Sequence, residues 1–82
     1  MSQKLPELNV WDMSSAKCAF RSYVLRQRAI SASGARAAML HGMAGFYILM
    51  GLAKSHKEHN SPKAGELLTA AFDRLNETRG AL

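Results

Sequence analysis

Apolar residues recur at three- and four-residue steps over three stretches of this 82-residue chain, the spacing typical of amphipathic helices. In the first stretch we predict a helix from about residue 10 to 30, after an irregular lead-in over residues 1–8. Asn9 is its expected N-cap, because an asparagine side chain accepts a hydrogen bond from the first turn. The stripe expected to face the core consists of Met13, Ala16, Phe20, Tyr23 or Val24, and Ile30.

The second stretch predicts a helix at about 35–57 that is apolar on nearly all sides. Between Ala37 and Ala53 only His41 and Tyr47 carry polar side-chain groups. A helix of this kind is buried, either in a protein core or in a membrane. Its apolar run from Gly42 to Ala53 is 12 residues long, whereas a span needs about 20. We therefore do not expect it to cross a membrane.

The third stretch predicts a helix at about 62–79. Ser61 is placed to cap it, and Pro62 suits a first helical position, where the missing N–H does no harm. Its apolar stripe consists of Ala64, Leu67 or Leu68, Ala71, Phe72 and Leu75. No stretch alternates as a strand would, so we predict an all-α fold, a small three-helix bundle in a single domain over residues 1–82.

The join between the first two helices has two interpretations. The run Ser31-Ala32-Ser33-Gly34 favours a break, with Ser31 or Ser33 capping the second helix. One glycine costs a helix only about 1 kcal/mol relative to alanine, so a single continuous helix is the alternative. We expect the break.

The helix at 35–57 has more apolar surface than two neighbouring helices cover, because each neighbour covers a stripe of roughly 100°. An exposed apolar strip on a small domain usually marks an interaction site. We therefore expect oligomerisation, as a homodimer or with a partner protein; in the alternative, the terminal segments cover the helix within one monomer. The predicted interface residues are Ala38, Met39, Gly42, Met43, Gly45, Phe46, Leu49 and Met50.

The net charge of +5 is concentrated in the middle of the chain. Between Met13 and Lys57 there are seven basic residues and no acidic one. Such a block attracts an anionic partner, which is a nucleic acid, a membrane surface or an acidic protein face. A solvated face that only aids solubility is the alternative. The predicted anion-binding residues are Lys17, Arg21, Arg26, Arg28 and Arg36.

The remaining chemistry points to no catalytic site, no metal and no cofactor, and we do not expect an enzyme. The single cysteine, Cys18, excludes an intramolecular disulfide. His56 and His59 are three residues apart, but two histidines make an incomplete metal site. No glycine-rich phosphate loop is present. No apolar leader is visible at the start, so a cytoplasmic location is expected.

The hypothesis that follows is a small helical protein-interaction module: an adaptor, inhibitor, regulator or secretion-type chaperone. It would bind stoichiometrically through the apolar helix at 35–57, and the basic residues of the first helix would attract an acidic partner. The alternative is a nucleic-acid-binding protein that contacts phosphates through those basic residues. The helix at 35–57 has few polar side chains with which to recognise base edges, so sequence-specific recognition is not expected.

Overall fold

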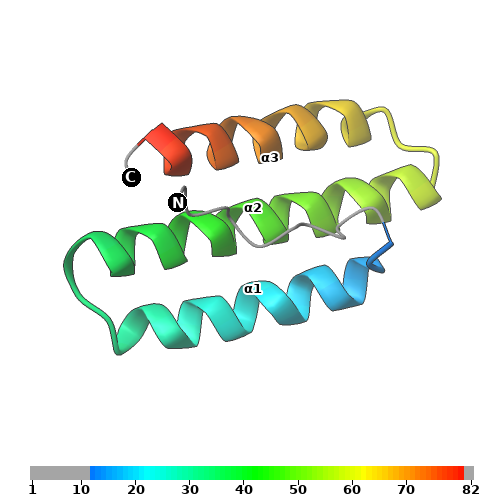
Figure 1. Cartoon of the computed structure of the whole chain (residues 1–82). Coiled ribbons are helices and arrows are strands. Elements are labelled where there is room, and N and C mark those ends of the chain that lie inside the picture. The colour runs from blue at the N-terminus through cyan, green and yellow to red at the C-terminus, as the bar shows by residue number, and fades with distance from the viewer. Residues whose placement is uncertain (1–11, 81–82) are drawn as a thin grey trace.

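The computed structural model describes residues 12–80 as three helices, with no strand among them: α1 (Ser15–Ile30), α2 (Gly34–Glu58) and α3 (Lys63–Gly80). Successive helices run antiparallel, and α2 lies between the other two (Figure 1). The all-α prediction and its three helices are confirmed. Completion of the bundle by oligomerisation stays a prediction.

The predicted start of the first helix near residue 10 is wrong. Asp12 and Met13 precede α1, and Ser14 is its N-cap, with an extended backbone. The Ser14 hydroxyl accepts a hydrogen bond from the Lys17 N–H at 3.1 Å. A serine hydroxyl that accepts a hydrogen bond from the first turn caps the start of a helix as effectively as the asparagine we had expected. Asn9 lies outside the described residues.

The predicted break between the first two helices is confirmed. The Ser31 N–H donates to the Arg28 carbonyl at 3.2 Å and closes α1. Gly34 then has φ +60°, a left-handed conformation that glycine adopts without steric cost. Ser33 occupies the N-cap position of α2, but its side chain makes no capping hydrogen bond. The backbone conformation of Gly34, rather than a serine cap, therefore makes the break.

The third helix begins at Lys63, one residue after the predicted start. The Ser61 hydroxyl accepts from the Lys63 N–H at 3.3 Å, as expected of a cap. The predicted inner stripe of this helix is also confirmed: Ala71 and Leu75 are buried in the core, and Leu68 and Phe72 pack against it. The charged side chains of α3 are exposed.

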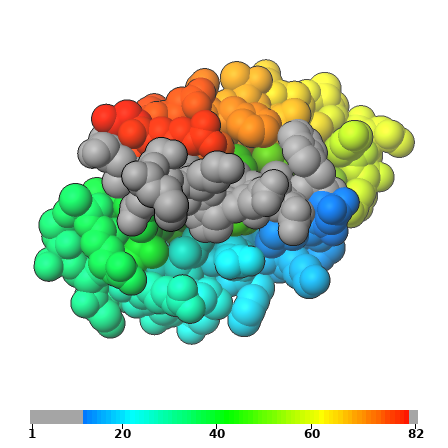
Figure 2. Space-filling view, in the orientation of Figure 1, coloured from blue at the N-terminus to red at the C-terminus, as the bar shows by residue number. Residues whose placement is uncertain are grey.

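The central helix makes most of the tertiary structure. It packs along its length against α1 on one side and α3 on the other, while α1 and α3 contact each other marginally at most. The space-filling view shows α1 along one edge of the molecule and α3 along the opposite edge (Figure 2). Each outer helix therefore keeps a face turned away from α2.

The contact between α2 and α3 is made by large side chains. The rings of Phe46 and Phe72 lie 5.9 Å apart between centroids and are tilted by 59°. Phe46 and Met50 are fully buried, and Met43 is nearly so. Burial of such side chains stabilises a fold by roughly 1.5–3 kcal/mol each. The buried core cluster consists of Cys18, Met43, Phe46, Tyr47, Met50, Ala71 and Leu75.

The contact between α1 and α2 includes two positions, Ala44 and Gly51, where only small groups meet. The Ser22 hydroxyl donates to the Ala44 carbonyl at 2.7 Å. A Cβ on Gly51 would lie 3.1 Å from the Cys18 Cβ and 3.2 Å from the Ser15 carbonyl oxygen. At Ala44 and Gly51 the two backbones therefore approach closely and leave no room for a large side chain, whereas Tyr47 of α2 lies beside Arg21 of α1.

The predicted inner stripe of the first helix is consequently wrong for most of its members, although Met13 does pack against the core. Cys18, Ser22 and Ala29 are the buried residues of α1. Ala16, Phe20, Tyr23 and Ile30 are exposed instead, while Met13 and Val24 are partly buried. The three- and four-residue spacing identified the helix correctly, but it did not identify the side that packs.

Candidate functional site

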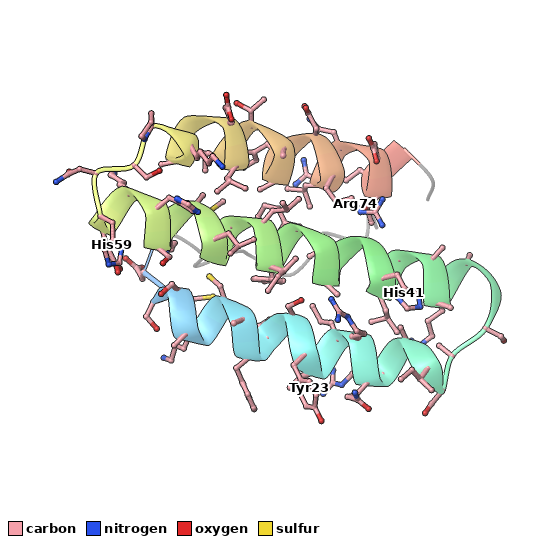
Figure 3. The ribbon with its side chains drawn as sticks, turned by 180° about the vertical axis from the view of Figure 1, so that it is seen from behind. Tyr23, His41, His59 and Arg74 are labelled. Atoms are coloured by element: carbon pink, nitrogen blue, oxygen red, sulfur yellow. The ribbon has the colours of Figure 1, made fainter. Side chains whose placement is uncertain are left out.

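The most exposed large apolar side chains of the described residues lie on α1. Phe20, Tyr23 and Ile30 are 68%, 58% and 70% exposed. Their spacing of three and seven places them on one side of the helix, opposite the buried Cys18, Ser22 and Ala29. Figure 3 shows Tyr23 pointing away from α2. We call these three residues the α1 ridge.

Basic residues flank the α1 ridge on both sides. At about 100° per residue, Lys17, Arg21 and Arg28 lie along one flank and Arg26 lies along the other. All four are exposed. The Arg21 guanidinium carbon is 5.7 Å from the Tyr47 ring centroid, so this side chain is turned toward α2. The predicted anion-binding residues of α1 therefore surround an apolar centre, which the sequence analysis had placed in the core.

The fifth predicted basic residue, Arg36, lies at the corner where α1 passes into α2. There it lines an open groove of about 780 Å³ together with Arg28, which the fold brings to the same place. The complete lining is Tyr23, Val24, Gln27, Arg28, Ser31, Ala32, Ser33 and Arg36. The groove continues the basic flank of the α1 ridge to the first turn of α2.

Four of the eight predicted interface residues on α2 are buried within the monomer: Gly42, Met43, Phe46 and Met50. Phe46 and Met50 are among the largest fully buried side chains. A Cβ on Gly42 would lie 2.0 Å from the Thr78 Oγ1, so α3 already occupies the space beside this glycine. These four residues serve the packing of one chain.

The other four predicted interface residues keep some exposure. Ala38 is exposed, whereas Met39, Gly45 and Leu49 are partly buried. The Arg74 side chain extends from α3 over Gly45, where a Cβ would meet its Nε at 2.9 Å (Figure 3). An arginine side chain is flexible, so this cover is easily displaced.

One side of α2 is covered by neither outer helix. It lies between the positions that contact α1 (Ala44, Gly51) and the position under Arg74 (Gly45). His41, Ile48 and Leu52 fall on this side. His41 is exposed, Ile48 is partly buried, and Leu52 is 44% exposed. We call these residues the free side of α2. The sequence analysis did not name Leu52 as an interface residue. It did predict that two neighbouring helices would leave part of this helix uncovered, which implies an exposed apolar residue of this kind.

A second groove, of about 450 Å³, lies between α2 and α3. Its lining is mostly apolar with two lysines: Met50, Ala53, Lys54, Lys57, Ala64, Gly65 and Leu68. The Lys54 ammonium donates a hydrogen bond to the Met13 carbonyl and so ties the start of α1 to α2. This lysine therefore has a structural role.

Two titratable groups of the core have shifted pKa values. Burial raises the pKa of the Cys18 thiol, and the nearby Lys54 charge opposes the shift in part. Burial also raises the pKa of Tyr47, opposed by Arg21. Both groups are therefore held neutral, and a buried neutral thiol is unreactive.

The histidines near the end of α2 form no metal centre with other ligands. Between residues 12 and 80, no group of three or more His, Cys, Asp or Glu side chains is arranged to hold a metal ion. The His59 Nδ1 lies 2.8 Å from the Ser55 carbonyl oxygen, where its N–H donates a hydrogen bond at the helix end.

By length and composition alone, α2 is long enough and apolar enough to cross a membrane. Half of the most apolar stretch of this helix is buried inside the protein, as in the central helix of a folded domain.

The chain matches no protein-family model, and it has no significant similarity to a curated protein or to a solved structure. The surfaces described above are therefore the basis for a functional proposal.

Proposed function

We propose that this chain is a small, non-enzymatic protein-interaction module, an adaptor or regulator that acts by stoichiometric binding. The free side of α2 is its docking side, and a second copy of the chain is the first partner to test. The observation that carries the proposal is the exposure of Leu52 on the most apolar helix of the molecule. Central helices are usually covered, and an exposed apolar strip on one marks an interaction site.

The arrangement of the three helices supports this docking side. Because α1 and α3 pack on α2 rather than on each other, Ile48 and Leu52 lie in a shallow strip between them. A partner helix in that strip would cover α2 on a further side, as in a four-helix bundle. Ala38 and Gly45 are small residues at its margin, so a partner backbone has room to approach.

Symmetry favours self-association as the form to test first. A two-fold dimer uses the same patch on both subunits, so one apolar strip is sufficient for both sides of the interface. Burial of this strip would also add to the core of a chain that is short for a stable domain. The basic residues of α1 surround a different surface and are not needed for this contact.

The test is the molar mass in solution, measured by light scattering at concentrations well above micromolar. We expect a dimer for the unchanged protein and a monomer for Ile48→Glu/Leu52→Glu, because two buried carboxylates would face each other across the two-fold axis. Phe20→Glu/Ile30→Glu is the matched control, with two carboxylates on the α1 ridge, and it should remain a dimer. Circular dichroism should show that both variants stay helical.

A monomeric mass for the unchanged protein would overturn self-association. The proposal of a protein partner then depends on affinity capture, with the unchanged protein compared against Ile48→Glu/Leu52→Glu. Loss of a stoichiometric partner in the variant would support the free side of α2 as a docking side. A partner captured equally by both proteins would show that it binds elsewhere.

A further inference from the structure

We propose that the outer face of α1 docks onto an anionic lipid bilayer, with the α1 ridge in the headgroup region and the flanking cations on acidic headgroups. This surface is separate from the free side of α2, and the inference does not depend on the proposed dimer. It rests on the exposure of the ridge, on the charge around it, and on the shape of the edge that α1 forms.

The first observation is the amount and kind of apolar surface on the α1 ridge. Phe20 and Ile30 are each exposed by more than two thirds, and Tyr23 by more than half. An aromatic ring with a hydroxyl, such as that of Tyr23, suits the boundary between hydrocarbon and water. Isolated exposed apolar residues are ordinary on protein surfaces, but three on one side of one helix form a patch.

The second observation is the charge on both sides of that patch. Lys17 and Arg28 lie on one flank and Arg26 on the other, all exposed, and no acidic residue occurs between Met13 and Lys57. A helix lying in a bilayer interface has this arrangement, in which an apolar centre enters the headgroup boundary and cations bind acidic lipids beside it.

The third observation is shape, and it favours a bilayer over a protein groove. The α1 ridge is on a helix at the edge of the molecule (Figure 2); Tyr23 lines the open groove at the corner with α2, whereas Phe20 and Ile30 are each exposed by more than two thirds. Partner helices usually bind in grooves between elements. A bilayer needs no groove, because lipids rearrange around inserted side chains.

The composition of the surface also favours lipid over nucleic acid. Phe20 and Ile30 lie between the two flanks of cations, so contacts of both flanks with a nucleic acid would place these apolar side chains against the charged backbone. On a bilayer, the same apolar centre contributes to binding. A dependence on both the charges and the apolar residues is therefore the feature that distinguishes the two partners.

The test is sedimentation of the whole chain with vesicles of phosphatidylcholine, with and without one third phosphatidylglycerol. We expect binding to the anionic vesicles only, weakening as salt shortens the Debye length. Lys17→Gln/Arg28→Gln should lower the partition coefficient by about 25-fold, at about fivefold per charge. Phe20→Ser/Ile30→Ser should lower it by roughly tenfold, because these side chains then have no apolar surface to bury.

Matched controls separate this face from the overall charge and from the free side of α2. Lys63→Gln/Arg79→Gln removes two exposed charges from α3 and should change the partition coefficient much less than the α1 pair does. Leu52→Ser removes an exposed apolar side chain from α2 and should leave vesicle binding unchanged. Circular dichroism of every variant checks that the helices persist.

A fluorescent reporter tests the depth of insertion directly. Phe20→Trp places an indole on the α1 ridge, and Asn76→Trp places one on an exposed position of α3. After subtraction of the emission of the unchanged protein, which contains Trp11, anionic vesicles should shift the emission of the first variant to shorter wavelength. The emission of the second should not change.

Three results would overturn the proposal. Equal binding by Phe20→Ser/Ile30→Ser and the unchanged protein would show that the ridge does not insert. Stronger binding to a DNA or RNA duplex than to anionic vesicles, lost only in the charge variant, would identify nucleic acid as the partner. Retention in the vesicles at high salt and alkaline pH would indicate a spanning helix rather than a docked one.

Discussion

Phe46 and Tyr47 of α2 and Phe20 and Tyr23 of α1 are similar residues in opposite surroundings. The first pair is 0% and 3% exposed, whereas the second is 68% and 58% exposed. Both pairs lie on regular helices that pack against each other. Helix formation therefore does not explain the difference in exposure. The difference shows that apolar character alone does not decide which side of a helix faces the core.

The deciding factor is the shape of the surface that each helix meets. Towards α3, Phe46 finds Phe72 and room for two rings. Towards α1, α2 presents Ala44 and Gly51, and the small residues Ser22 and Cys18 fit against them at close approach. Close packing of small residues gains contact along the whole helix, and the large residues of α1 are left outside.

The strongest test of this comparison truncates one ring from each pair. Phe46→Ala should lower the free energy of unfolding by about 3–5 kcal/mol, because it leaves a cavity in the core. Phe20→Ala should change it by no more than about 0.5 kcal/mol, because this side chain is mostly exposed. Denaturant unfolding followed by circular dichroism measures both. Similar losses in the two variants would place Phe20 in a buried contact and contradict the comparison.

The close approach of α1 and α2 is tested by placing a larger side chain between the two helices. Gly51→Leu should destabilise the protein by roughly 1–3 kcal/mol, because the new side chain meets Cys18 and the Ser15 carbonyl. Gly65→Leu is the matched control on α3, where a Cβ has no neighbour within 4 Å. It should stabilise the protein by about 0.5–1 kcal/mol through helix propensity alone. Thermal unfolding of the pair gives both signs, and a stabilised Gly51→Leu would mean that the helices are not in close contact.

The smallest effect concerns the pH dependence of the two buried groups at these contacts. Burial raises the pKa of Cys18 and of Tyr47, so their contribution to stability is fully present below the pKa values of the unfolded chain. It is lost as pH rises through the folded values. We therefore expect the free energy of unfolding to fall from about pH 8.5 upward, where the unfolded thiol begins to ionise.

Cys18→Ala separates the two groups in this measurement. The variant should show a shallower decline that begins nearer to pH 10, where only the phenol of Tyr47 contributes. Denaturant titrations between neutral and alkaline pH compare the slopes, so any loss of stability from the smaller side chain does not affect the result. A decline that is the same with and without the thiol would mean that Cys18 is not buried in its neutral form.

Much of this fold is determined by the sequence itself. The three- and four-residue spacing defined three helices, and Gly34 and Ser61 marked where α2 and α3 begin, because backbone freedom and capping act over a few neighbouring residues. The inner stripe of α3 was also predictable, since its polar and apolar sides are distinct. The basic block of residues 13–57 needs no structure to be recognised.

Only the tertiary structure decided which side of α1 and α2 faces the core. Both helices carry apolar residues on more than one side, so the hydrophobic effect, which has no direction, favours several orientations nearly equally. The choice depends on the fit of Cys18 and Ser22 against Ala44 and Gly51, residues far apart in the chain. That fit left Phe20 and Ile30 exposed among the cations of α1, and so created a surface that spacing alone had assigned to the core.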